Sequence, residues 1–147
     1  MIIMIAAMSK NRVIGNNGTI PWYDKNEFKH FRDTTINQSV LMGSKTWYSL
    51  PKRPLTNRYN FVLSSKEIDN AHVIHDCIIP EYETDDLYII GGENVYKQYI
   101  DHCDQILLST MDLYCDGDSF FPEVPANFKL SETINHGNFI VEKYIKC

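Results

Sequence analysis

Apolar runs alternate with helical patterns along most of the chain. Four short runs predict buried strands, at residues 1–8, 39–43, 59–64 and 87–91. Three segments with helical spacing follow such runs, at 25–36, 44–50 and 93 to about 100. Strands that alternate with helices in this way predict an α/β fold, in which flanking helices cover a central, mostly parallel sheet.

The remaining segments suggest how the sheet ends. A weaker strand is expected at 72–75 and another strand at 104–112, while 76–86 stays ambiguous. The last two strands, 128–134 and 138–146, flank the turn His136-Gly137-Asn138. They predict an antiparallel C-terminal hairpin, which would make the sheet mixed at one edge.

Two further segments, 9–23 and 113–127, show no regular pattern and are expected to be irregular. A loop as long as 9–23 is uncommon in a compact domain and is typical of a functional segment. No repeat or linker divides the chain, so we expect a single domain over residues 1–147.

Composition excludes several classes of function. The net charge is −5 and no basic run is present, which argues against binding to nucleic acid. The apolar start is too short to cross a bilayer and lacks the features of a signal peptide, so we expect a cytoplasmic protein without membrane contact. The four cysteines form no Cys-x-x-Cys pair and lie near no histidine at a zinc spacing. We expect reduced thiols, mostly in packing roles, and no metal site.

Two predicted strands run into helices through glycine, one at Gly43 and the other at Gly91-Gly92. Glycine lets a ligand approach the backbone closely, and the following helix start offers free N–H groups. Two such turns suit a ligand with two anionic groups, such as a dinucleotide. The spacing matches neither the Rossmann nor the P-loop motif, and two ordinary tight turns would explain each glycine alone.

One acidic side chain is a candidate for chemistry. Glu27 lies on a helical stripe with Phe28 and Phe31, so it is either a partly buried acid or a solvated helix residue. Arg58 could bind a carboxylate through two hydrogen bonds, or it could be an ordinary surface residue. The turn Ser64-Ser65-Lys66 could bind a phosphate, or it could be an ordinary turn without a ligand. The residues alone therefore indicate an α/β protein that binds a multiply anionic ligand.

The ordered set of short segments resembles the dihydrofolate reductase family along nearly the whole chain. The matching segments are Ile5-Ala6-Ala7, Val13-Ile14-Gly15, Pro21-Trp22 with an acid five residues later, Met42-Gly43-x-x-Thr46-Trp47, Arg53-Pro54-Leu55-x-x-Arg58, Ile89-Ile90-Gly91-Gly92 with Tyr96, and Asp116-Gly117-Asp118-x-x-Phe121-Pro122. Each segment is weak evidence alone, but their shared order and spacing are highly specific.

The resemblance implies NADPH-dependent reduction of 7,8-dihydrofolate to 5,6,7,8-tetrahydrofolate, with hydride transfer to pterin C6 and protonation at N5. Glu27 would hold pterin N3 and the 2-amino group, and the proton would arrive through water near Trp22. Arg58 would pair with the α-carboxylate of the substrate, and the Ser109 hydroxyl would support the acid. The folate pocket would comprise Ile5, Ala6, Glu27, Phe28, Phe31, Leu50, Leu55, Arg58, Ile90 and Ser109.

The same resemblance assigns a cofactor site and a cis bond between Gly91 and Gly92. NADPH would contact Ala7, Ile14, Gly15, Gly43, Lys45, Thr46, Ser64, Ser65, Lys66, Ile90, Gly91, Gly92, Glu93, Asn94, Val95 and Tyr96. Ser44 stands where the family often places a cation for the 2′-phosphate, and Lys45 and Lys66 are the cations available to compensate. A monomer is expected.

Two alternatives remain open at this point. One is another NADPH reductase of the same fold, of the pyrimidine reductase type in riboflavin synthesis. The other is a non-catalytic structural or nucleotide-binding subunit. The 76–86 segment and the closing hairpin are shorter than is usual in the family, and both are expected to lie away from the chemistry.

Overall fold

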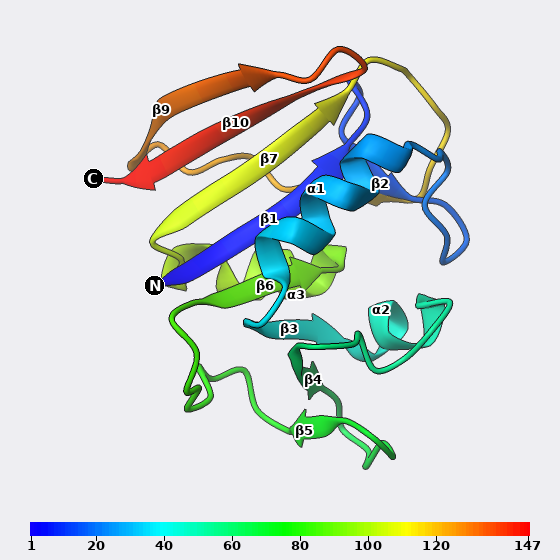
Figure 1. The fold of residues 1–147 in the computed structure, drawn as a ribbon, viewed down its shortest axis with the longest axis vertical. Helices are drawn as coiled ribbons and strands as arrows, with labels where there is room; N and C mark the ends of the chain where they lie inside the picture. Colours follow the sequence, from blue (N-terminus) through cyan, green and yellow to red (C-terminus); the bar gives the residue numbers. More distant parts are fainter.

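An eight-stranded sheet runs through the middle of the molecule (Figure 1). The computed structural model describes residues 1–147 and gives the strand order β5-β4-β3-β6-β1-β7-β10-β9. The strands are β1 (Ile2–Met8), β3 (Ser39–Gly43), β4 (Tyr59–Leu63), β5 (His72–Ile74), β6 (Leu87–Gly91), β7 (Gln105–Met111), β9 (Phe128–Asn135) and β10 (Phe139–Lys146). Only β10 runs against its neighbours, β7 and β9. The predicted mixed sheet with an antiparallel C-terminal hairpin is confirmed.

Helices cover both faces of this sheet. Helices α1 (Lys25–Thr35) and α2 (Ser44–Ser49) lie on one face, and α3 (Glu93–Tyr99) lies on the other, followed by a short 3-10 helix (Ile100–His102). Along β1 the side chains alternate, since Ile3 and Ile5 pack on the α1 side and Met4 packs on the α3 side. This alternation follows from the two-residue period of a strand. The three predicted helices are confirmed to within a residue or two at their ends.

The two segments predicted to be irregular contain a second small sheet, so that prediction is wrong in part. Strand β2 (Val13–Gly15) from the long loop pairs with β8 (Ser119–Phe120). Backbone bonds extend the pairing, with Phe121 N–H donating to Arg12 O at 3.0 Å and Asp118 N–H donating to Gly15 O at 3.1 Å. Strands of two or three residues are too short for a period of two to be visible in the sequence.

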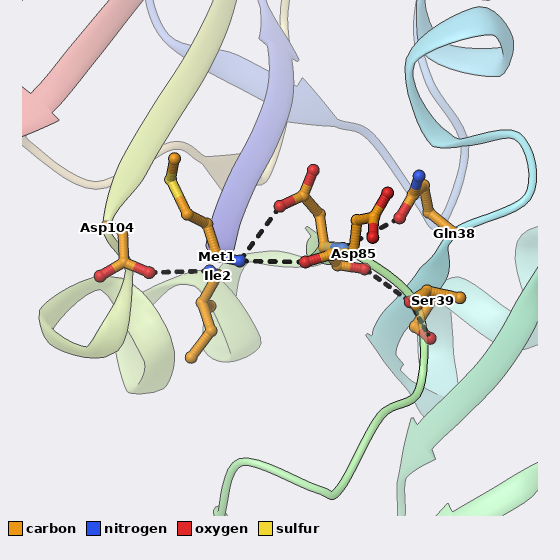
Figure 2. A network of polar contacts seen from close by, with 8 residues as sticks. Met1, Ile2, Gln38, Ser39, Asp85 and Asp104 are labelled. Atoms are coloured by element: carbon orange, nitrogen blue, oxygen red, sulfur yellow. Dashed lines mark hydrogen bonds and ion pairs between the residues drawn. The ribbon is translucent and has the colours of Figure 1, made fainter.

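A polar network holds the amino edge of the main sheet (Figure 2). The Met1 ammonium donates to Asp86 Oδ1 at 3.1 Å, and Ile2 N–H donates to Asp104 Oδ2 at 2.8 Å. The Asp86 N–H donates to Gln38 Oε1 at 2.9 Å. These contacts join the starts of β1, β3, β6 and β7, so the carboxyl ends of the same strands meet at the opposite edge.

The cysteines are free thiols, but the expectation that most of them serve packing is wrong. Only Cys103 is buried, whereas Cys77 and Cys147 are exposed and Cys115 is half-buried. Spacing alone does not reveal the burial of a lone thiol, because that depends on which face of the fold it reaches. None of the helices is both long enough and apolar enough to span a membrane.

Gly117 lies where the β8 segment meets β2, and the structure leaves no room there for a side chain. A Cβ atom at Gly117 would lie 2.2 Å from Val13 Cγ1 and 2.7 Å from Gly15 O. We expect Gly117→Ala to lower the free energy of unfolding by about 1–3 kcal/mol, the usual cost of overpacking. Urea unfolding measures this loss, and amide exchange should accelerate at Val13–Gly15.

Gly137→Ala is the matched control. Gly137 has a φ of +93° and open space around its Cβ position, so an alanine there adds backbone strain without a clash. Its cost should be about 1 kcal/mol, with unchanged exchange at Val13–Gly15. Normal exchange at those residues in Gly117→Ala would contradict the packing argument.

Candidate active site

The two glycine turns lie side by side at the carboxyl edge of the sheet. Gly43 ends β3 and Gly92 follows β6, the neighbouring strand. A Cβ atom at Gly43 would lie 3.0 Å from Val95 Cγ2, and one at Gly92 would lie 3.4 Å from Thr46 Oγ1. Neither following helix has a side-chain cap, and the Gly91–Gly92 bond is cis, as predicted. The glycines therefore let the two turns pack closely against each other, and the start of each following helix is left without a side-chain cap.

Further predicted phosphate ligands reach the same edge. Lys45 is the second residue of α2, while Ser64-Ser65-Lys66 follows β4, which pairs in parallel with β3. Lys66 N–H donates to Ser64 Oγ at 3.1 Å. The exposed side chains of Lys45 and Lys66 place two cations beside the glycine turns.

His75 also touches the Ser64–Lys66 turn, which the sequence did not reveal. Its Nδ1 lies 2.9 Å from Ser64 O and its Nε2 lies 2.8 Å from Glu67 Oε1. The hydrogen bond to Glu67, followed by that to Ser64, raises the pKa of His75. Nothing in the chain pattern signals this contact, because it joins the end of β5 to a turn eight or more residues earlier.

Glu27 is a buried acid, which answers the question that the sequence left open. Asp24 caps α1 by accepting hydrogen bonds from Asn26 N–H and Glu27 N–H, both at 3.0 Å. This cap fixes Glu27 in the first turn, where its side chain is only 7% exposed. No hydrogen bond within the chain reaches its carboxylate. Burial, and to a lesser degree the charge of Asp24, raises the pKa of Glu27 to about 7.

Several predicted folate-pocket residues come together on the α1 side of the sheet. One apolar cluster contains Ile5 and, packed against it, Phe31, Leu50, Leu55 and Ile90. Ala6 does not join them, because its side chain belongs to the cluster on the α3 side. Phe28 also lies outside the cluster, being 37% exposed, with its ring centroid 5.3 Å from that of Tyr23.

Two of the predicted site residues, Tyr96 and Ser109, are buried polar side chains, and Tyr96 lies within the influence of the Glu27 charge. Tyr96 donates to Ile5 O at 2.8 Å, and burial together with the nearby Glu27 charge raises the pKa of Tyr96. Ser109 is buried and pairs with Ala7 in the β1–β7 register. The Ser109 hydroxyl makes no direct hydrogen bond to Glu27, so the predicted support for the acid is not a direct contact.

Trp22 packs against the cluster of Met111, Phe139 and Val141 beside the start of α1. Its indole N–H is buried and has no hydrogen-bond partner. A buried donor without a protein partner is rare and costly, which marks this position as one that suits a polar ligand atom or water.

Arg58 is half-buried near the end of α1. Its Nε donates to Thr56 O at 2.9 Å and its Nη1 donates to Thr35 Oγ1 at 3.1 Å. Burial, followed by repulsion from Arg32, lowers the pKa of Arg58. The remaining guanidinium N–H groups are available to a carboxylate. Arg32 is a second cation here that sequence reasoning missed, although its place four residues after Phe28 on one helix face was a usable signal.

The tip of the closing hairpin lies beside α1, so the expectation that it lies away from the chemistry is wrong. Asn138 Nδ2 donates to Asp24 Oδ2 at 3.4 Å, next to the helix cap. The ring of His136 lies 5.8 Å from that of His30, centroid to centroid. Sequence distance hid this contact, because the hairpin follows α1 by about a hundred residues. The 76–86 segment does lie away, since its end joins the network at the amino edge.

Together, fold and site define an α/β protein with one buried acid and, beside it, adjoining glycine turns and cations that suit an anionic ligand. Residues 1–144 match the family model described as dihydrofolate reductase. The dihydrofolate reductase of Mycoplasma genitalium is 38% identical over 158 residues, which cover 99% of this chain and 98% of that protein. The one from Buchnera aphidicola subsp. Acyrthosiphon pisum is 40% identical over 127 residues, covering 83% and 79%. The chain belongs to the dihydrofolate reductase family.

A solved structure agrees. Dihydrofolate reductase from Enterococcus faecalis, complexed with NADP(H) and RAB-propyl, superposes with a TM-score of 0.89 and 28% sequence identity. The match covers 99% of this chain and 96% of that one. The protein is therefore an oxidoreductase with the fold of this family, and neither the pyrimidine reductase nor the non-catalytic alternative is favoured.

Glu27 should make stability depend on pH. Its pKa of about 7 exceeds the usual 4.5, so the folded protein holds this proton more tightly than the unfolded chain. That stabilisation is complete below pH 4.5 and is lost as pH rises through 7. Relative to wild type, Glu27→Gln should gain about 2–3 kcal/mol of unfolding free energy between pH 4.5 and 8.

Urea unfolding of both proteins at pH 4.5, 6 and 8 measures this difference. Glu132→Gln, a change of the same kind on the exposed strand β9, should follow wild type at every pH. A constant difference between Glu27→Gln and wild type would show that Glu27 ionises as a solvated acid does.

Proposed function

We propose that the protein reduces 7,8-dihydrofolate to 5,6,7,8-tetrahydrofolate at the site around Glu27, with NADPH as the hydride donor. The observation that carries the proposal is a buried carboxylate without an internal hydrogen-bond partner. Its charge helps to raise the pKa of Tyr96, whose ring lies against Gly91 at one of the two adjoining glycine turns. Membership of the dihydrofolate reductase family supports the reaction. The complex of the E. faecalis relative with NADP(H) supports the cofactor.

The residues at the carboxyl edge fit a dinucleotide. Gly43 and Gly92 let the two turns pack together, and the helix starts that follow them carry no side-chain cap, so their free N–H groups would be available to a pyrophosphate. Lys45 and Thr46 would bind phosphate oxygens, and the Ser64–Lys66 turn would hold the phosphate on the adenosine ribose. Ala7, Ile14 and Gly15 would lie against the nicotinamide, with Tyr96 behind them.

Glu27 orients the substrate in this proposal. Its carboxylate binds pterin N3 and the 2-amino group, which are the donors that a ring of this kind offers to an acid. When bound, NADPH supplies the hydride that reaches pterin C6. A pKa near 7 lets Glu27 hold a proton at neutral pH, and reduction of the ring requires a proton at N5.

Trp22 helps to deliver that proton. Its indole N–H lies buried without a partner, so it would bind a water molecule that leads toward N5. Positioning of two reactants and exclusion of bulk water can supply much of the reduction of the barrier. The protein's own residues therefore act mainly by placement and by setting the environment of one acid.

Arg58 would bind the α-carboxylate of the substrate tail. Two of its N–H groups are already fixed by Thr35 and Thr56, which holds the guanidinium plane in one orientation. The apolar cluster of Phe31, Leu50 and Leu55 would line the path from the pterin to this cation.

We further propose a monomer that acts in the cytoplasm. The four cysteines are free thiols, two of them exposed, which suits a reducing compartment.

The proposed reaction is tested by following the loss of NADPH absorbance with dihydrofolate. We expect turnover by wild type and a loss of roughly 10²–10⁴-fold in Glu27→Gln at pH 7, the usual contribution of a positioned acid. Glu132→Gln should match wild type. Folded wild-type protein that binds NADPH yet leaves dihydrofolate unreduced would refute the proposed substrate.

The role of Arg58 gives a different signature. Loss of a charge-assisted hydrogen bond costs roughly 1.5–3 kcal/mol, so Arg58→Gln should raise the KM for dihydrofolate roughly ten- to a hundredfold. The kcat should change little, because Arg58 touches no reacting atom. Lys52→Gln, a neutralised cation on the same exposed loop, is the control. A fall in kcat at unchanged KM would exclude a tail-binding role.

A further inference from the structure

Glu93 makes an unusual contact for the first residue of a helix. Its Oε1 accepts a hydrogen bond from Phe120 N–H at 2.5 Å, across 27 positions of sequence. Its Oε2 accepts one from Lys97 Nζ at 3.0 Å, one helical turn further on. An acid in the first turn usually interacts with the helix's own amide groups, but this carboxylate is engaged with a different segment.

The segment that Glu93 holds is β8. Phe120 in β8 pairs with Val13 in β2 of the long loop. The next residue, Phe121, is bound to Arg12 twice, since its N–H donates to Arg12 O at 3.0 Å and its carbonyl accepts from Arg12 Nε at 3.2 Å. A single carboxylate therefore connects the glycine turn at Gly92 to β8, and β8 connects it to the loop.

The remaining contacts fix this connection on its other sides. Asn17 N–H donates to Asp118 Oδ2 at 3.1 Å, so the loop is held on both sides of Gly15. The Phe121 ring packs edge-on against Tyr96 of α3, with 5.1 Å between centroids. The hydrogen bond from Phe120, and then that from Lys97, lowers the pKa of Glu93, so the carboxylate is charged when it holds β8.

We propose that Glu93 is a positioning residue, which fixes β8 and thereby the Arg12–Asn17 part of the long loop against the glycine turn that begins α3. We call this contact, in which Glu93 binds Phe120 of β8, the brace, and it is present in the folded chain without any ligand. Its effect on turnover rests on the proposed function, in which Ile14 and Gly15 lie against the nicotinamide. The resemblance places Glu93 among the NADPH contacts, but in the structure both of its carboxylate oxygens are engaged, with Phe120 and Lys97. We therefore assign it no reacting atom and a role that acts through the loop.

Two conservative variants separate the effect of the length of the Glu93 side chain from the effect of its charge. Glu93→Gln keeps an oxygen within reach of Phe120 N–H and loses the charge, whereas Glu93→Asp keeps the charge and is one methylene too short. Amide exchange is measured first, on the protein without ligands. In Glu93→Asp, exchange at Phe120 and at Arg12–Asn17 should accelerate roughly tenfold or more, as expected for loss of a hydrogen bond to a charged group. In Glu93→Gln it should stay within about threefold of wild type.

Kinetics form the second readout. Glu93→Asp should lower kcat roughly five- to tenfold with the KM for dihydrofolate unchanged, and Glu93→Gln should restore most of the loss. Lys97→Ala removes only the exposed ion pair and should match wild type in both measurements, since such pairs contribute little.

The outcomes are distinct. The inverse pattern, with Glu93→Gln impaired and Glu93→Asp normal, would make Glu93 an electrostatic residue and overturn the brace. Wild-type exchange in Glu93→Asp would overturn it as well. Altered exchange in a protein whose wild type does not reduce dihydrofolate would uphold the brace and refute the proposed function.

Discussion

Parallel strands that start together at one edge of a sheet must also end together, and the whole site depends on this alignment. The contacts of Met1, Asp86 and Asp104 tie the starts of the central strands. The carboxyl ends of β3 and β6 then bring Gly43 and Gly92 side by side. Open α/β sheets bind ligands at this edge for the same reason. Residues that are some fifty positions apart in the sequence thus form one surface.

The central acid is placed at the expense of stability. A shift in the pKa of Glu27 from 4.5 to about 7 corresponds to about 3 kcal/mol, which is a large share of the 5–15 kcal/mol that typically holds a domain. Asp24 adds to this cost, because the cap that begins α1 also repels the Glu27 carboxylate. Nothing in the chain offsets the charge, so the arrangement suits a bound partner more than it suits the free fold.

The regular elements could be predicted because long apolar runs and helical spacing are local properties. The burial of Glu27 could not, since it depends on how distant segments pack around the first turn of α1 and not on the residues of the helix alone. The β2–β8 pairing could not be predicted either, because strands of two or three residues are too short to show a period in the sequence. The side chain of Ala6 packs on the α3 side, which the matching motif could not reveal, because a motif names residues without saying which way a strand turns each side chain. The Glu93–Phe120 contact has no sequence signal at all.

Two segments of the chain, 76–86 and the closing hairpin, are shorter than is usual in the family, and they lie in different places in the fold. The 76–86 segment reaches the amino edge, where Asp86 N–H donates to Gln38. It also packs on the α3 side, where Ile79 and Tyr82 join the apolar cluster. The hairpin is different, because its tip places Asn138 against Asp24 and His136 beside His30. The tip, and not the length of the strands, is therefore the part of the hairpin that contacts the helix carrying Glu27.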